Sequence, residues 1–192
     1  MSENQLPTAG QIPTAGQTIG PFFGYALPYE GGEDLVPAHH PHAVRLSGIV
    51  FNGAGTPVPD ALVEIWQPDE NGEIPKRRGS LSRDGHSFTG FGRSATTRDG
   101  VYSFTTVEPA ALAGSTSAPF LACLVFARGL TDKLHTRIYL PGAGDTLAAD
   151  PLLSSLSAER RTTLMATREP DGSLHHDFHL QGPEETVFLD FG

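Results

Sequence analysis

Apolar and polar residues alternate in short stretches along the chain, and the clearest stretch covers residues 44–51. There Val44, Leu46 and Val50 fall on one face, while Arg45 and Ser47 fall on the other. A period of two residues predicts a strand with one buried face. The turn-forming residues 52–55 follow directly, so we expect a strand over 44–51 that ends in a tight turn.

The same spacing recurs further along the chain. Residues 61–67 place Leu62, Glu64 and Trp66 on one face and two β-branched residues on the other. A hairpin is expected around Asp99-Gly100, because this pair supplies the positive φ angles of a tight primed turn. Further strands are expected at 101–105, 120–127, 135–140, 175–180 and 186–191.

A helical pattern is expected in one place, residues 155–168. Glu159 near its start and Arg168 near its end suit the helix dipole. The 22 glycines and 16 prolines interrupt the chain too often for long helices. Seven or eight short strands with one short helix predict an all-β fold, an antiparallel β-sandwich.

The first 43 residues differ from the rest of the chain. A pentapeptide at 7–11 recurs at 13–17, and Phe22, Phe23 and Tyr25 follow among glycines and a proline. We interpret 1–43 as an N-terminal arm and loop, and 44–192 as the β-sandwich domain. Aromatic side chains on a free arm would form an unfavourable apolar patch, so the arm is expected to pack on this domain or on a partner chain.

Composition narrows the class of protein. The 192 residues include 13 basic and 22 acidic ones, and the formal net charge of −9 makes nucleic-acid binding unexpected. The longest apolar run, 119–127, is too short to span a bilayer. A single cysteine and a start without a basic, apolar leader predict a cytoplasmic protein.

Histidines invite a metal hypothesis. Two clusters have suitable spacing: His39, His40 and His42, and His175, His176 and His179. We interpret the first as a solvated or interface loop. In the second, His175 and His179 share an exposed strand face, while His176 points the opposite way. A metal bound by either cluster stays an open alternative, which requires metal in the isolated chain. Cys123, within an apolar run, is expected to be buried and unreactive.

Several motifs resemble those of the intradiol ring-cleavage dioxygenase family. They are Leu46-x-Gly48-x-Val50, Gly55, Val58, Val63-Glu64-Ile65 and Gly72, then Gly92-Arg93, Thr96, Gly100, Tyr102 and Phe104. Further matches to one subunit type, an alpha-type chain, are 17–22, 126–129, 135–139 and 185–191. The resemblance therefore extends from Gln17 to the end of the chain.

The resemblance implies an iron site that this chain lacks. Catalytic members hold a mononuclear ferric ion with two tyrosinates and two histidines. At the corresponding positions this sequence carries Ile74, Leu112, Leu121 and Cys123. One thiol among aliphatic side chains makes no metal site. We therefore expect no metal and no catalytic residue on this chain, with Fe(III) held by a partner beta chain.

The resemblance also implies a shared function. It predicts a hetero-oligomer with a homologous iron-binding beta chain, which cleaves protocatechuate (3,4-dihydroxybenzoate) with O₂ to 3-carboxy-cis,cis-muconate. The isolated chain is then inactive. Thr18, Gly20, Pro21 and Arg128 are implied substrate contacts, with Arg128 offsetting the substrate carboxylate.

Without the resemblance, Arg128 is an ordinary surface arginine. The alternative function is then a non-enzymatic β-sandwich that serves as an assembly or binding module. Arg93 and Arg137 are expected to be structural partners of buried acids such as Glu64.

Overall fold

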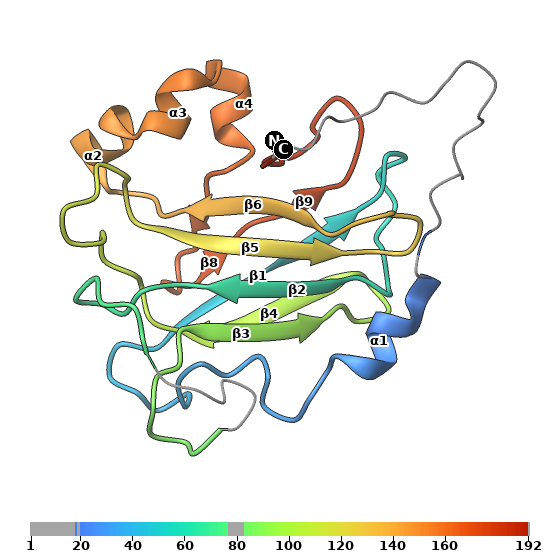
Figure 1. The fold of residues 1–192 in the computed structure, drawn as a ribbon, viewed down its shortest axis with the longest axis horizontal. Coiled ribbons are helices and arrows are strands. Elements are labelled where there is room, and N and C mark those ends of the chain that lie inside the picture. The colour runs from blue at the N-terminus through green and yellow to red at the C-terminus, as the bar shows by residue number, and fades with distance from the viewer. Residues whose placement is uncertain (1–17, 19, 77–82, 192) are drawn as a thin grey trace, which may run out of the picture.

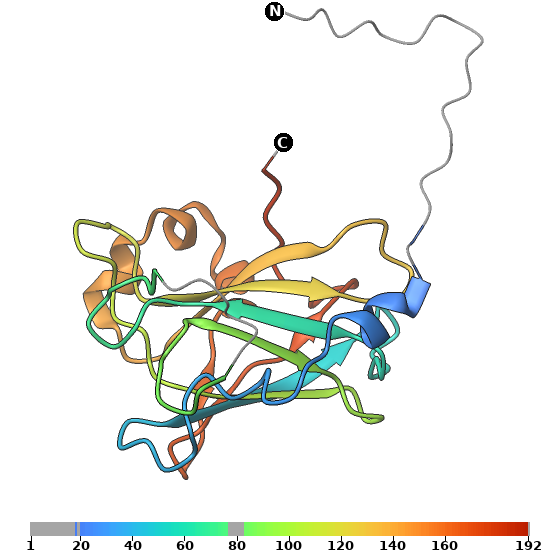
Figure 2. The ribbon, with the colours of Figure 1, turned by 60° about the horizontal axis from the view of Figure 1, so that its bottom comes forward.

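Two stacked β-sheets make up the body of the protein, as Figures 1 and 2 show. The computed structural model describes residues 18, 20–76 and 83–191. The duplicated pentapeptide of the arm lies outside these described residues. The predicted β-sandwich is confirmed.

The first sheet is built around β1. Its strands are β1 (Val44–Phe51), β4 (Val101–Thr106), β7 (Thr167–Arg168), β8 (Leu174–His175) and β9 (Phe178–His179). They follow the order β4-β1-β8-β7, and β9 also pairs with β1. β1 is antiparallel to β4 but parallel to both β8 and β9. This sheet is therefore mixed, whereas the sequence predicted a purely antiparallel one.

The second sheet is antiparallel and has the order β3-β2-β5-β6. Its strands are β2 (Leu62–Trp66), β3 (Phe91–Ala95), β5 (Phe120–Phe126) and β6 (Leu134–Tyr139). Leu46 and Val50 of the first sheet and Ile65 and Val125 of the second are fully buried in one core between the layers. The alternation predicted for 44–51 is confirmed, because every second residue of β1 is buried.

A close backbone approach explains one glycine of the family motif. A Cβ atom on Gly48 would lie 1.6 Å from the carbonyl oxygen of His176. That same oxygen accepts a hydrogen bond of 2.6 Å from the Tyr102 hydroxyl. Gly48 therefore lets the segment around His176 pack directly on β1.

The expectation of one helix over 155–168 is wrong. The described residues form a 3-10 helix, η1 (Gly20–Phe22), and four short α-helices: α1 (Phe23–Ala26), α2 (Gly144–Ala149), α3 (Pro151–Ser155) and α4 (Ala158–Thr162). Leu156 is extended, and the Ser157 hydroxyl then caps α4 by accepting from the Arg160 amide at 3.3 Å. An N-cap near the start of the predicted helix therefore separates α3 from α4, and Thr167–Arg168 at its end form β7.

A buried carboxylate holds this helical corner on the sandwich. Asp150 caps α3 by accepting from the Leu152 and Leu153 amides at 2.9 and 3.0 Å. It also accepts from the Tyr139 hydroxyl and the Ala118 amide, each at 3.0 Å. The loop before β5 and the end of β6 are thereby fixed to the helices.

Two further sequence expectations differ from the structure. The turn at Asp99-Gly100 exists, since Gly100 has φ +73° and donates to Thr97 O at 3.0 Å. It connects β3 and β4, which belong to different sheets, so it closes no hairpin. The predicted strand at 186–191 forms an isolated bridge between Leu189 and His135 in the described part of the chain.

None of the helices formed by the described residues is long and apolar enough to cross a bilayer.

Candidate functional site

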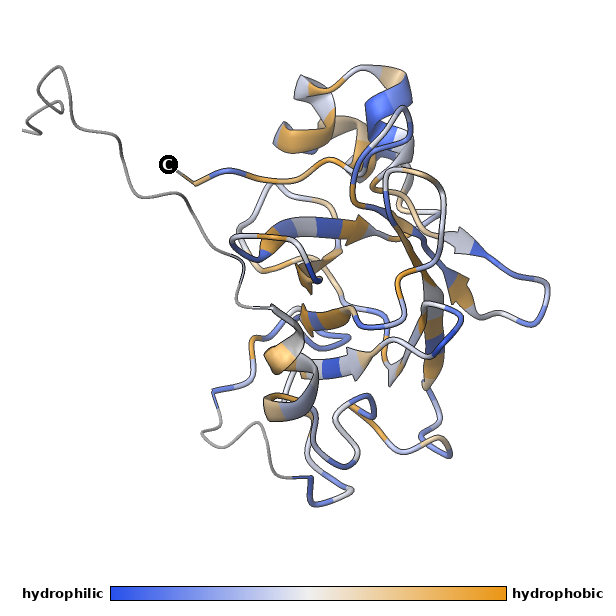
Figure 3. Ribbon diagram, turned by 90° about the vertical axis from the view of Figure 1, so that its right-hand side faces the viewer, coloured by the Kyte–Doolittle hydropathy of each residue, from blue (hydrophilic) through white to orange (hydrophobic). Residues whose placement is uncertain are grey.

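Helix α1 lies at the end of the sandwich where β5 finishes (Figure 1). Phe23 is buried there, with its ring centre 6.1 Å from that of Phe126 on β5. Phe22 and Tyr25 are 71% and 87% exposed. Figure 3 looks at this end of the molecule and shows apolar residues on α1. Of the three aromatic side chains of the arm, Phe23 therefore packs on this chain, while Phe22 and Tyr25 remain exposed.

The predicted substrate contacts of the arm, Thr18, Gly20 and Pro21, lie at or just before η1, which leads into α1. The Gly20 amide donates to the Thr18 hydroxyl at 3.2 Å. Gly20 has φ +65°, a left-handed conformation that favours glycine. Pro21 lies in η1. Gly20 is thus hydrogen-bonded back to Thr18, and Gly20 and Pro21 lie just before α1.

Arg128 follows β5 at this same end of the sandwich. Its side chain is 63% exposed, and its Nη2 atom lies 2.8 Å from Oδ2 of Asp60. A guanidinium has five N–H donors, so this ion pair leaves donors for a second anion. Asp60 was not predicted from the sequence: it precedes β2 and lies beside Arg128 because β2 pairs with β5.

The expected pairing of Arg93 with Glu64 is confirmed. Nε and Nη2 of Arg93 lie 2.7 and 2.6 Å from Oε1 of Glu64. Nη1 donates to the Leu27 carbonyl oxygen at 2.6 Å, and the Tyr29 ring lies 5.6 Å from the guanidinium carbon. Arg93 therefore ties the segment after α1 to the outer face of the second sheet.

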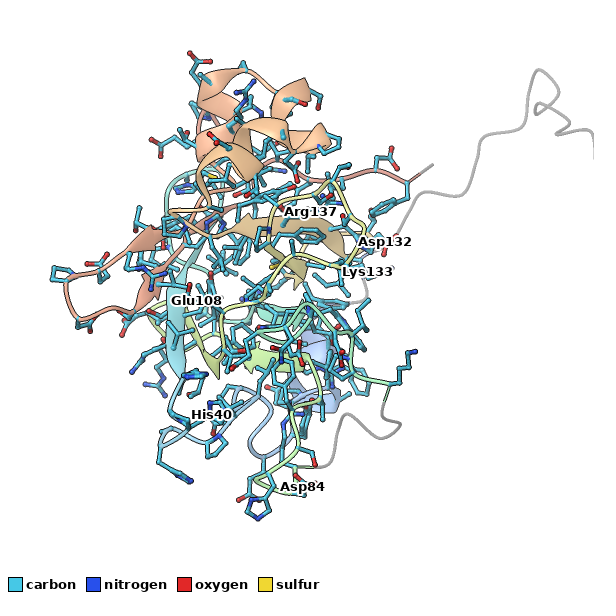
Figure 4. The ribbon with its side chains drawn as sticks, turned by 90° about the vertical axis from the view of Figure 1, so that its left-hand side faces the viewer. His40, Asp84, Glu108, Asp132, Lys133 and Arg137 are labelled. Atoms are coloured by element: carbon cyan, nitrogen blue, oxygen red, sulfur yellow. The ribbon has the colours of Figure 1, made fainter. Side chains whose placement is uncertain are left out.

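Arg137 has different partners from those expected. Arg137, which is labelled in Figure 4, donates to the Tyr139 hydroxyl at 3.0 Å, and its guanidinium carbon lies 4.1 Å from the centre of the Phe120 ring. The buried acid nearby, Asp150, accepts a hydrogen bond from the Tyr139 hydroxyl instead. Arg137 thus reaches the acid through Tyr139 and stacks on an aromatic face.

A cavity of about 310 Å³ opens at the other end of β5. The end of β2, the start of β5 and the intervening loops line it. Its lining residues include Trp66, Ile74, Leu112, Phe120 and Ala122. In Figure 1 this end of β5 lies opposite to α1. Arg128 and helix α1 are therefore separated from the cavity by the length of the strand.

The cavity separates the four positions at which the resemblance expects iron ligands. Ile74 and Leu112, the two positions where the resemblance expects tyrosines, both line it. Leu121 and Cys123, the positions assigned to the histidines, are buried in the core between the sheets. Successive residues of a strand point to opposite faces, so the cavity-facing positions are Phe120 and Ala122, each one residue earlier.

The groups that face this cavity do not fit a ferric ion. Hard cations take oxygen and nitrogen donors, whereas Ile74, Leu112, Phe120 and Ala122 offer hydrocarbon. Cys123 faces the core, where burial raises the pKa of its thiol well above the usual value.

The histidine clusters have protein partners. His42 Nδ1 lies 2.6 Å from Glu70, and His175 Nε2 lies 3.1 Å from Asp177. His176 is buried, as its predicted strand face requires, and its Nε2 atom has no hydrogen-bond partner. Within residues 18, 20–76 and 83–191, no three His, Cys, Asp or Glu side chains are grouped so that they could hold a metal ion.

Comparison with known proteins places these features in a family. A family model described as "Dioxygenase" matches residues 19–182. A protocatechuate 3,4-dioxygenase alpha chain from Burkholderia cepacia is 38% identical, with 96% of this chain and 100% of that protein aligned. The alpha chain from Pseudomonas putida is 36% identical, with 93% and 96% aligned. A beta chain from Burkholderia cepacia is 27% identical, with 80% and 75% aligned.

Solved structures share the fold. An intradiol ring-cleavage dioxygenase from Tetranychus urticae matches with a TM-score of 0.55 and 18% identity, covering 81% of this chain and 88% of that one. Catechol 1,2-dioxygenase from Pseudomonas arvilla C-1 matches with a TM-score of 0.57 and 18% identity, covering 80% and 58%. The chain belongs to the intradiol dioxygenase family, and it is similar over nearly its whole length to protocatechuate 3,4-dioxygenase alpha chains.

Proposed function

We propose that this chain is the alpha subunit of a hetero-oligomeric dioxygenase that opens the ring of protocatechuate with O₂ to give 3-carboxy-cis,cis-muconate. The observation that carries the proposal is the alignment with an alpha chain at 38% identity over 96% of this chain. The 27% identity to a beta chain supports a partner of the same fold. In this proposal the beta chain holds Fe(III), since the cavity of the alpha chain presents hydrocarbon where ligands are required.

The substrate contacts of this chain are proposed to lie at the α1 end of the sandwich. Thr18, Gly20 and Pro21 would approach the flat ring, and Arg128 would bind the carboxylate. The support is their location at one end of β5 and the exposure of Arg128. A charge-assisted hydrogen bond to a carboxylate also offsets the repulsion expected from a net charge of −9.

The arm, residues 1–43, is proposed to pack on the beta chain. Phe22 and Tyr25 support this, because each exposes most of a large aromatic side chain beside the proposed contacts. The rest of the chain, 44–192, is the sandwich domain in this proposal. A cytoplasmic location stays a prediction from the sequence.

Co-expression tests the proposal. The chain alone and the chain with a homologous beta chain are purified, and protocatechuate-dependent O₂ uptake and iron content are measured for each. We expect activity and iron in the complex, and neither in the chain alone. Stoichiometric iron in the isolated chain, or full activity of the beta chain alone, contradicts the proposal.

Arg128 separates an enzyme subunit from a passive assembly module. Arg128→Ala is expected to reduce kcat/KM for protocatechuate by about 1–3 kcal/mol in transition-state free energy, and to leave catechol turnover nearly unchanged. Catechol has no carboxylate, so the loss of the Arg128 guanidinium should not affect it. Arg98→Ala, in the turn between β3 and β4, is the matched control and should leave both substrates unchanged. Unaltered protocatechuate kinetics in the Arg128 variant would favour the assembly module.

A further inference from the structure

The cavity at the Phe120 end of β5 has an apolar lining that differs from the rest of the surface. We propose that it is a binding site for a small uncharged aromatic ring of the alkylbenzene class. The inference rests on the geometry of this chain alone, so it does not depend on the proposed function. It assigns a ligand to the cavity in which the family's metal ligands are absent.

The size of the cavity suits one substituted ring. Its volume is about 310 Å³, at the lower end of the range for small-molecule pockets. A dry apolar cavity of about 150 Å³ already accommodates benzene. The cavity therefore has room for a single ring with a short alkyl substituent.

Its walls offer aromatic and aliphatic surface. The Trp66 and Phe91 rings are in contact, with centres 4.4 Å apart, and Trp66 is 48% exposed on the cavity side of β2. Phe120 is held in place by the Arg137 guanidinium, 4.1 Å from its ring centre. Ile74 at the rim is 60% exposed. A bound ring would remove these apolar surfaces from water, which favours binding.

Two of the polar side chains of the lining, Gln67 and Thr89, already have partners within the chain. Gln67 donates to the Val107 carbonyl oxygen at 2.8 Å and accepts from the Thr106 hydroxyl at 2.7 Å. The Thr89 hydroxyl accepts from Arg83 at 2.8 Å. These groups are therefore engaged and leave hydrocarbon as the main recognition surface.

The lining also selects against charged ligands. None of the described residues that line the cavity is charged. A carboxylate entering it would lose its hydration without gaining a cation, which is unfavourable. Benzoate and protocatechuate are thereby disfavoured relative to toluene, which has nothing to desolvate but apolar surface.

Trp66 provides the readout, because it is the single tryptophan of the chain. The full-length chain is titrated with toluene, and tryptophan emission and the melting temperature are recorded. We expect a saturable change with a dissociation constant of about 1 mM or tighter, and an increase in melting temperature. Benzoate, which has the same ring and a carboxylate, is expected to bind at least tenfold more weakly.

Two residues on one face of β5 give a matched pair of variants. Ala122→Phe fills the cavity and should abolish both responses to toluene, whereas Leu124→Phe, on the same face outside the cavity, should retain them. If Ala122→Phe fails to fold, Ile74→Asp replaces it, because this exposed rim position tolerates a charge and should weaken toluene binding at least tenfold. A toluene titration without saturation, equal binding of benzoate, or unchanged binding to the variant that folds overturns the proposal.

Discussion

The Nη2 atom of Arg93 lies 2.6 Å from Oε1 of Glu64, and both side chains are nearly enclosed, with 13% and 9% exposed. The same guanidinium holds the Leu27 carbonyl oxygen. This pair therefore connects the β2–β3 ladder to the segment that follows α1. Its loss should affect both the stability of the sandwich and the placement of α1.

Glu64→Leu is expected to lower the free energy of unfolding by about 3–5 kcal/mol, because it leaves a buried guanidinium without its carboxylate. Urea unfolding of the full chain measures the change. The double variant Glu64→Leu, Arg93→Met should recover much of the loss, since it removes both charges together. A loss below about 1 kcal/mol in the single variant would show that the pair contributes little.

Asp60 and Arg128 give a prediction that rests on the proposed function. Asp60→Asn removes a carboxylate 2.8 Å from the guanidinium, so the substrate carboxylate meets less repulsion and less competition. KM for protocatechuate in the assembled enzyme is expected to fall about two- to fivefold, the size of an exposed ion pair. KM for catechol should stay the same. A rise in KM for protocatechuate would mean that Asp60 orients Arg128 instead.

Gly48→Ala is expected to destabilise the protein by about 3 kcal/mol or more. Its Cβ atom would lie 1.6 Å from the His176 carbonyl oxygen, so β1 and the segment packed on it must separate. Thermal unfolding checks this. Gly24→Ala in α1 is the control: its Cβ atom has nothing within 4 Å, and its effect should stay within about 1 kcal/mol. Equal effects of the two substitutions would contradict the assigned contact.

His176 makes stability depend on pH in a defined window. Burial lowers its pKa to about 4 from the usual 6.5. The unfolded chain therefore binds a proton at this site between pH 6.5 and 4 while the folded chain does not, so stability falls as the pH falls through this window. The contribution totals about 3 kcal/mol, and it is constant above pH 6.5 and below pH 4.

The variant His176→Leu isolates this contribution. The neighbouring Asp177, His175 and His179 act electrostatically on His176, so the informative quantity is the difference between the wild-type and variant stability curves from pH 7 to pH 4. Between pH 7 and pH 4 the wild type should lose about 3 kcal/mol more free energy of unfolding than the variant does. Parallel curves would show that His176 is protonated without cost in the folded chain.

The local sequence pattern predicted where the strands lie better than it predicted which strands pair with each other. The 44–51 strand has the predicted bounds, because its alternation and the following turn are both local properties. The pairing of β1 with β8 and β9 joins residues more than 120 positions apart, and periodicity carries no information on that. The turn at Asp99-Gly100 was found for the same local reason, yet its two strands enter different sheets.

The site could be predicted in part. The charge of Arg128 and the turn-forming Gly20 were visible in the sequence. The ion pair of Asp60 with Arg128 was not, because it depends on the pairing of β2 with β5. The sequence motif does not specify which face of β5 looks outward. The structure does, by burying Leu121 and Cys123 in the core.

The two faces of β5 have an evolutionary consequence. Residues on the outer face at 120 and 122 meet the cavity, while their neighbours at 121 and 123 meet the opposing sheet. Selection can therefore act on one set without disturbing the other. After duplication of an ancestral gene, one copy can discard its ligand chemistry and still inherit an intact architecture, which leaves it available to specialise as a companion of the other copy.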